Sequence, residues 1–169
     1  MARSRRAKPA FDAARNPTLA PPANAAQYIC LVYQDERKIA ALADEELDAI
    51  VAACMDWIGE LERSGQHVFS AGLQSVKTAV TVRRRDGRIS STDGPFAETK
   101  EHLGGLTTIS AGDLNEAIAI ASKLPATKIG TVEVRPVLRS DVAPGDPVDR
   151  RIAASIRRCA GIAQPSIQR

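Results

Sequence analysis

The stretch TDGPFAETKEHLGG, residues 92–105, concentrates acidic, basic and histidine side chains between two apolar segments. A carboxylate held in a cleft can act as a general base, so we take Asp93 and Glu98 as the candidate catalytic residues. Three further side chains could hold an anionic group or line the same cleft: Tyr33, Lys100 and Arg135. These residue types predict a site for a small polar or anionic molecule.

Glycine and proline in this stretch predict a defined corner. Gly94 can take a positive φ, Pro95 restricts the backbone on both sides, and Phe96 could pin the turn to the core. The residues after Pro95 could then form a helical turn that begins with this proline. Asp93 has two interpretations of about equal weight, because its carboxylate could serve a ligand or could accept backbone N–H groups of its own turn.

A metal site in the same stretch is the weaker interpretation. In a helical turn, Glu98, Glu101 and His102 would lie close enough together to bind an ion, but no further ligand follows from the spacing. A solvated polar face explains the same residues, so we predict no metal.

Alternating and helical apolar patterns indicate the elements that must position these residues. One amphipathic helix follows Asp44, with its apolar face at Leu47, Ile50, Val51, Cys54, Ile58 and Leu61 and a stop at Gly65. A second begins at Asp113, which forms a capping box with Glu116, and its predicted buried positions are Leu114, Ala117, Ile118, Ala121 and Leu124. Strands are predicted over residues 27–33, 67–73, 77–85, 105–111 and 130–138.

The pair Asp86-Gly87 predicts a hairpin after the third strand, since a type I′ turn needs two residues with positive φ. In that strand Val80 and Val82 alternate with polar residues, as in a half-buried strand. The order of the elements predicts an α+β ferredoxin-like sandwich with both helices on one face of one sheet. The other face would be apolar and uncovered, and pairing two sheets in a homodimer would cover it.

Charge and composition divide the chain into three segments. Residues 1–26 are basic and rich in Ala and Pro, which predicts a disordered tail, and residues 27–138 form the predicted domain. Residues 139–169 contain a Pro/Gly linker and then a basic amphipathic helix. Because residues 27–138 hold sixteen acidic and twelve basic side chains, the net charge of +3 comes from the ends, and no nucleic-acid partner is predicted.

The remaining composition indicates a cytoplasmic protein. Three cysteines with no C-x-x-C spacing favour a reducing compartment, and no apolar run approaches the ~20 residues that span a bilayer, so no membrane association is predicted. The chain has no phosphate loop or dinucleotide-binding motif, and we therefore expect no cofactor.

The literal motif DGPFAETKEHLGG, with VRRRDGRISSTDGPF before it and VEVRPVL after it, resembles the DGPF (DGPFAETKE) branch of the YCII-related family. The resemblance runs from about Gln27 to Leu138 and implies a dimeric α+β barrel. Some relatives in the wider family are enzymes that eliminate chloride with a His–Asp pair, in which Asp93 would correspond to the aspartate. Their histidine lies on the first helix, where this chain has none, and position 102 departs from the glutamine of the family pattern.

We therefore expect a homodimer that binds a small polar or anionic molecule near Asp93. One alternative is a lyase or isomerase in which Asp93 or Glu98 moves a proton. A second alternative is a regulatory role, because the resemblance implies a link to sigma-factor systems and the basic tail could contact a protein partner.

Overall fold

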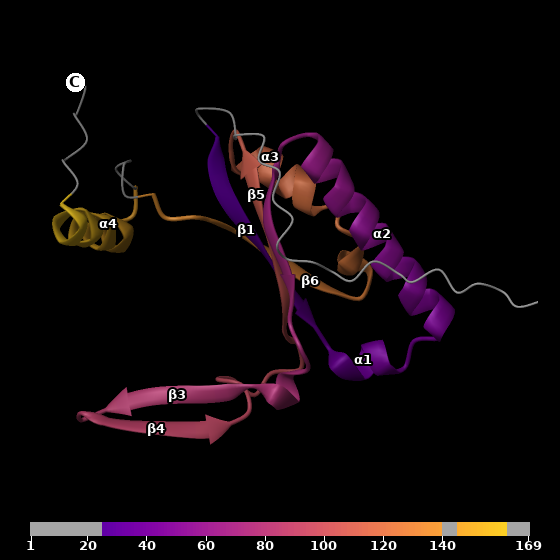
Figure 1. The fold of residues 1–169 in the computed structure, drawn as a ribbon, viewed down its shortest axis with the longest axis horizontal. Coiled ribbons are helices and arrows are strands. Elements are labelled where there is room, and N and C mark those ends of the chain that lie inside the picture. The colour runs from indigo at the N-terminus through magenta and orange to yellow at the C-terminus, as the bar shows by residue number, and fades with distance from the viewer. Residues whose placement is uncertain (1–24, 140–144, 162–169) are drawn as a thin grey trace, which may run out of the picture. The chain divides into compact units, whose positions relative to one another are not determined.

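The protein is described by a computed structural model covering residues 25–139 and 145–161 (Figure 1). The chain divides into two compact units between Arg135 and Pro136, and each unit is described by itself.

The first unit contains a four-stranded sheet with the order β2-β5-β1-β6. Its strands are β1 (Ala26–Gln34), β2 (His67–Gly72), β5 (His102–Ala111) and β6 (Gly130–Pro136). β5 pairs antiparallel with both β1 and β2, so those two strands run in the same direction and require a crossover connection. The helix α2 (Asp44–Arg63) provides this connection, after the short helix α1 (Glu36–Ala40).

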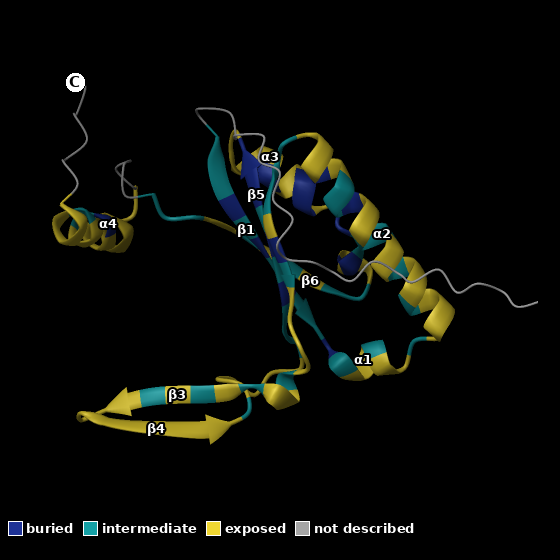
Figure 2. Cartoon of the chain, in the orientation of Figure 1, coloured by how far each residue is buried: buried dark blue, intermediate teal, exposed yellow. Residues whose placement is uncertain are grey.

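The core lies between one face of this sheet and the helices α2 and α3 (Leu114–Ala121), as Figures 1 and 2 show. Alternate residues of β1 point into it, namely Tyr28, Cys30 and Val32, because successive side chains of a strand point to opposite faces. The helices contribute Trp57, Leu61, Ala117, Ile120 and Ala121. This arrangement confirms the predicted α+β ferredoxin-like fold with both helices on one face.

Trp57 of α2 is buried and contacts α3. It is 5 % exposed, and its indole N–H donates a hydrogen bond of 3.3 Å to the carbonyl oxygen of Ile120. The contact orients α3 so that Ile120 is buried while the predicted core positions Leu114 and Ile118 are exposed. The prediction for those two residues was wrong because α3 carries two neighbouring apolar stripes, and spacing alone does not show which of them is buried.

The two ends of α2 and the start of α3 can be compared with the sequence predictions. Three acidic residues, Asp44, Glu45 and Glu46, occupy the first turn of α2, and Gly65 takes a φ of 71° just beyond its last turn. At the start of α3, the Asp113 carboxylate accepts the Glu116 N–H at 2.8 Å, and the Glu116 carboxylate accepts the Gly112 N–H at 2.7 Å. The predicted stop is therefore confirmed, and so is the Asp113 half of the capping box, whereas the Glu116 carboxylate bonds to the residue before the N-cap and not to the N-cap N–H.

The hairpin of β3 (Val80–Arg85) and β4 (Arg88–Asp93) turns at Asp86-Gly87, where φ is 49° and 77°. The predicted hairpin is confirmed, but it forms a separate two-stranded sheet and does not extend the main one. Val80 and Val82, predicted to be half-buried, are 59 % and 67 % exposed in the single chain, because no part of the main sheet covers them.

The second unit contains α4 (Pro147–Ala160), whose first turn is capped by Asp146 and which ends at Gly161. Val148, Ile152 and Ile156 are exposed on it beside four arginines. None of the described helices is both long and apolar enough to cross a membrane. The predicted disordered tail, residues 1–26, lies almost entirely outside the described residues.

Candidate functional site

The five residues predicted from the sequence lie on different elements. Asp93 ends β4, Tyr33 lies near the end of β1, and Arg135 lies on β6 beside Glu133, its ion-pair partner at 3.6 Å. Glu98 and Lys100 lie in the segment between β4 and β5, and both are exposed. Within the described part of the chain, no hydrogen bond or ion pair joins any two of the five.

The corner at Asp93 is built as predicted, although its side chains face outward. Gly94 has a φ of 98°, donates its N–H to the Ala79 carbonyl at 2.7 Å and accepts the Thr81 hydroxyl at 2.8 Å. Asp93 is exposed in the single chain. Phe96 is 79 % exposed, and its ring centre lies 5.7 Å from the Arg83 guanidinium, so it does not pin the turn to the core. The predicted helical turn is also absent, since residues 95–101 form bends that lead into β5.

The acidic residues after β1 have structural partners. Asp35 is 7 % exposed, caps α1 and accepts two hydrogen bonds from the Arg37 guanidinium, which holds the pKa of its carboxyl below its usual range. Glu36 accepts the Val76 N–H at 2.7 Å and the Ser75 hydroxyl at 2.9 Å. These bonds lower the pKa of Glu36 and fasten the loop before β3 to α1.

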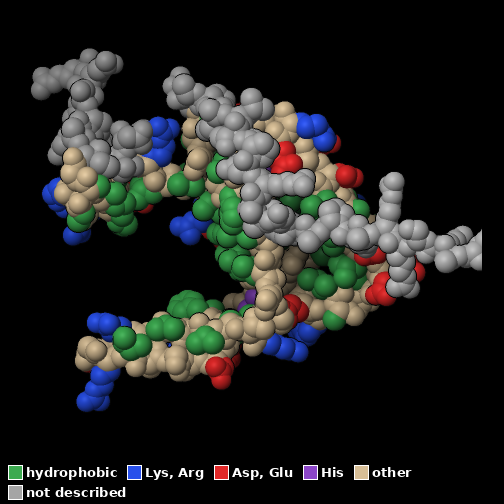
Figure 3. Space-filling view, viewed as in Figure 1, with side chains coloured by type: hydrophobic (Ala, Val, Ile, Leu, Met, Phe, Trp, Pro, Cys, Tyr) green, Lys and Arg blue, Asp and Glu red, His purple; other side chains and the backbone are tan. Residues whose placement is uncertain are grey.

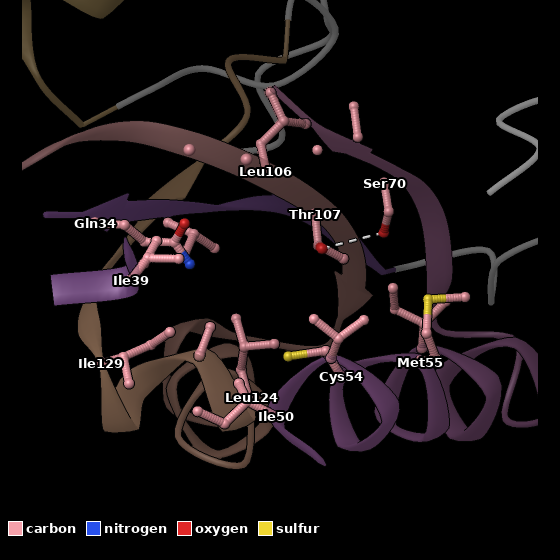
Figure 4. Close-up of a pocket in the computed structure, with 18 of the residues that line it drawn as sticks. Gln34, Ile39, Ile50, Cys54, Met55, Ser70, Leu106, Thr107, Leu124 and Ile129 are labelled. Carbon is pink, nitrogen blue, oxygen red and sulfur yellow. Dashed lines mark hydrogen bonds between the residues drawn. The ribbon is translucent and has the colours of Figure 1, made fainter. Parts of the chain in front are cut away.

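A cavity of about 330 Å³ lies between α2 and the sheet (Figure 4). Its walls include most of the apolar stripe predicted for α2: Leu47, Ile50, Val51, Cys54 and Ile58. Val51 and Met55 are 51 % and 44 % exposed, which makes them the rim of this hollow. Most of the stripe therefore borders this cavity, and two of its members, Cys54 and Ile58, also pack against the core.

Small residues of the sheet leave this space open. Gly104 and Gly105, the last residues of the TDGPFAETKEHLGG stretch, line the cavity on β5. A Cβ atom on Gly105 would come within 2.9 Å of the Ala71 carbonyl oxygen on the neighbouring strand. No charged side chain is present among the described residues that line the cavity, so its walls suit an uncharged molecule.

Two buried hydroxyl groups form one polar edge of the cavity, and the side chain of Gln34 also lines it (Figure 4). Ser70 on β2 is 7 % exposed and Thr107 on β5 is 5 % exposed, and Ser70 Oγ donates to Thr107 Oγ1 at 3.1 Å (Figure 4). His67 Nε2 lies 2.8 Å from Ser70 Oγ, and the tautomer decides which of the two donates. The other ring nitrogen, Nδ1, lies 3.9 Å from a carboxylate oxygen of Glu62.

A β-bulge at the start of β2 brings the His67 ring to the Ser70 hydroxyl. Residues three apart on a regular strand point to opposite faces, but the pairing of β2 with β5 shifts register between His67 and Phe69. The extra residue turns His67 to the face that carries Ser70. The alternation of the sequence gives no sign of this bulge, so the contact between His67 and Ser70 does not follow from their spacing.

The titrating groups around the cavity are neutral at neutral pH. Burial raises the pKa of the Cys54 thiol, an effect that the backbone amide of Ala126 partly opposes. Burial also lowers the pKa of His67 below its ordinary value, and the Glu62 carboxylate opposes part of this shift. A neutral imidazole beside a hydroxyl is a competent proton acceptor. Among the described residues, no group of three or more His, Cys, Asp and Glu side chains could hold a metal ion.

The antiparallel sheet, the helical layer on one face and the cavity between them define an α+β protein of the ferredoxin-like class. Residues 26–141 match the YCII-related domain, and the chain belongs to this family. The chain is also 34 % identical over 114 residues to an uncharacterized protein of Rhizobium meliloti (strain 1021), an alignment that covers 65 % of this chain and 90 % of that protein.

Proposed function

We propose that the protein binds a small, mainly apolar molecule in the cavity between α2 and the sheet. The observation that carries this proposal is the pairing of uncharged, mainly apolar walls with a few hydrogen-bonding groups, the hydroxyls of Ser70 and Thr107 and the amide of Gln34. Small-molecule sites commonly combine an apolar cavity with a few placed polar groups. A volume of about 330 Å³ favours a single ring or a short chain.

This proposal keeps the predicted ligand near the DGPF stretch but changes its chemistry. Gly104 and Gly105 end that stretch and line the cavity, whereas Asp93, Glu98 and Lys100 are exposed away from its walls. The absence of charge from the described walls favours a neutral ligand over the anionic one expected from the sequence. A polar group on the ligand would face the two hydroxyls.

Filling the cavity should abolish binding. Replacing Cys54 with phenylalanine places a ring among the lining residues, and we expect the affinity for p-nitrophenol, a single-ring molecule with one hydroxyl, to fall at least tenfold, or about 1.4 kcal/mol. Binding can be measured by calorimetry and by saturation-transfer NMR. The matched control is Cys159→Phe, since Cys159 is exposed on α4. Saturable binding that is equal in both variants, or no binding by the unmodified protein, would contradict the proposal.

We also propose that two copies of the chain pair through the hairpin and the open face of the sheet. Val80, Val82 and Ile89 are 59 %, 67 % and 65 % exposed, and their side chains share one face of the hairpin because Val82 pairs with Ser91 and Arg84 with Ile89. Apolar side chains gather on that face in Figure 3. Exposed apolar patches of this kind favour a protein partner, and the resemblance to dimeric barrels favours a second copy.

The same pairing gives Asp93 a defined environment. Asp93 lies opposite Val80 in the hairpin, so its side chain is on the apolar face. A second copy that covered this face would withdraw the carboxylate from water, which is the condition under which it could serve as a general base.

A charge on this face should prevent pairing. We expect Val82→Asp to convert a dimer into a monomer in size-exclusion chromatography with light scattering at micromolar concentration, because the new carboxylate would lie opposite Ser91, with no cation across the strand pair, and would have to be buried. Ile118→Asp is the control, since Ile118 is 50 % exposed on the outer side of α3. A monomeric unmodified protein, or a dimer that survives Val82→Asp, would reject this mode of pairing.

A further inference from the structure

Four side chains lead from the surface to the cavity. Glu62, with 48 % of its side chain exposed, stands at the outer end, and the His67 ring, 15 % exposed, follows it. His67 Nε2 is 2.8 Å from Ser70 Oγ, and Ser70 Oγ is 3.1 Å from Thr107 Oγ1. Both hydroxyls line the cavity. The chain of contacts therefore joins a solvated carboxylate to the polar edge where a ligand would lie.

The protons of these hydrogen-bonded side chains can be arranged in two ways, because each hydroxyl carries a single proton. In one, Nε2–H of His67 donates to Ser70, and Ser70 donates to Thr107. In the other, Nε2 is bare and accepts the Ser70 proton, so that Ser70 no longer donates to Thr107 and Ser70 Oγ can accept a proton from the cavity. The Glu62 carboxylate, 3.9 Å from Nδ1, favours a proton on Nδ1 and hence the second arrangement.

We propose that Ser70 and His67 form a proton relay that removes a proton from a weakly acidic, otherwise apolar ligand in the cavity. The acidic proton of the ligand passes to Ser70 Oγ as the proton of Ser70 passes to His67 Nε2. The products are a ligand anion and an imidazolium, and no bond other than those to the two protons changes. The inference rests on the proposed binding function and adds to it the chemical class of the ligand.

The surrounding groups stabilise both products. Thr107 can turn its hydroxyl toward the ligand anion, and the Glu62 carboxylate faces the imidazolium. The apolar walls would not stabilise an anion by themselves, so a ligand can ionise there only if the relay takes its proton. The β-bulge before Ser70 is the feature of the backbone that makes this pairing possible, and bulges commonly re-aim side chains beside active sites.

The optical probe p-nitrophenol tests the relay directly, because its phenolate absorbs visible light and its phenol does not. With the full-length protein at neutral pH, we expect part of the bound probe to be phenolate. His67→Gln keeps a hydrogen-bonding group beside Ser70 but cannot take up the proton. The ratio of phenolate to phenol in the bound probe should fall at least tenfold, about one pKa unit, while binding persists. Ser70→Ala should act in the same way.

His102→Gln is the matched control and should leave the ratio unchanged, since His102 is the other histidine and has no place in the chain of contacts. A probe that binds equally ionised to the unmodified protein and to His67→Gln would overturn the relay and leave the binding function intact. If the probe does not bind at all, the binding function fails instead. Nitrogen-15 NMR of the unliganded protein then decides the relay, since a proton on Nδ1 supports it and a proton only on Nε2 contradicts it.

Discussion

Replacing Trp57 with alanine should lower the free energy of unfolding by about 3–5 kcal/mol, the range for removing a large buried aromatic side chain. Trp57 is 5 % exposed and contacts the layer formed by α3, so the substitution leaves a space that the surrounding residues cannot close. Urea denaturation followed by far-UV circular dichroism at fixed protein concentration measures the change. Tryptophan fluorescence is unsuitable, because Trp57 is the only tryptophan.

Two further variants separate volume from hydrogen bonding. Trp57→Phe keeps most of the ring and removes only the N–H that bonds to the Ile120 carbonyl, so we expect a loss of about 1 kcal/mol. Ile118→Ala removes a side chain that is 50 % exposed and should cost less than about 1 kcal/mol. Equal losses for Trp57→Ala and Ile118→Ala would show that Trp57 does not organise the core.

Replacing Gly130 with alanine should be nearly as damaging, with an expected loss of about 3 kcal/mol, the upper end of the range for overpacking. Gly130 is the first residue of β6, and a Cβ atom there would collide with the carbonyl oxygen of Tyr33 on β1. The position of the Cβ atom is fixed by the backbone of β6 and the oxygen belongs to the backbone of β1, so neither can move without displacing a strand. Thermal and urea unfolding would both report the loss.

The control for Gly130 is Gly104→Ala. A Cβ atom on Gly104 would lie 2.6 Å from Oε1 of Gln34, which is the mobile end of a side chain. Gln34 can rotate away, so we expect a loss below about 1 kcal/mol. If Gly104→Ala costs as much as Gly130→Ala, the difference between backbone and side-chain contacts does not determine the effect.

Local patterns predicted the elements of this protein well. The Asp86-Gly87 turn, the Gly65 stop and the Asp113–Glu116 capping box involve residues a few positions apart, and their chemistry follows from backbone φ and hydrogen bonding within one segment. The apolar stripe of α2 also followed from spacing alone. These features, taken in chain order, were enough to predict the ferredoxin-like fold.

The candidate site could not be predicted in the same way. The stretch with the most evident chemistry, residues 92–105, sends Asp93, Glu98 and Lys100 outward and contributes two glycines to the cavity. The residues that form the chain of polar contacts beside the cavity, His67, Ser70 and Thr107, look ordinary in the sequence because all three lie in apparently regular strands. Their meeting depends on strand pairing between β2 and β5.

The sequence by itself determined which helices and strands form and where their caps and turns lie, because capping, turn geometry and apolar periodicity act over a few residues. Strand bounds were less exact, since β3 begins at Val80 and not at residue 77, and β5 begins at His102 and not at residue 105. Only the tertiary structure decided which stripe of α3 is buried, that most of the α2 stripe borders a cavity, and that His67 reaches Ser70. Each of these depends on contacts between segments far apart in the chain, and one bulged residue is enough to reverse the face to which a side chain points.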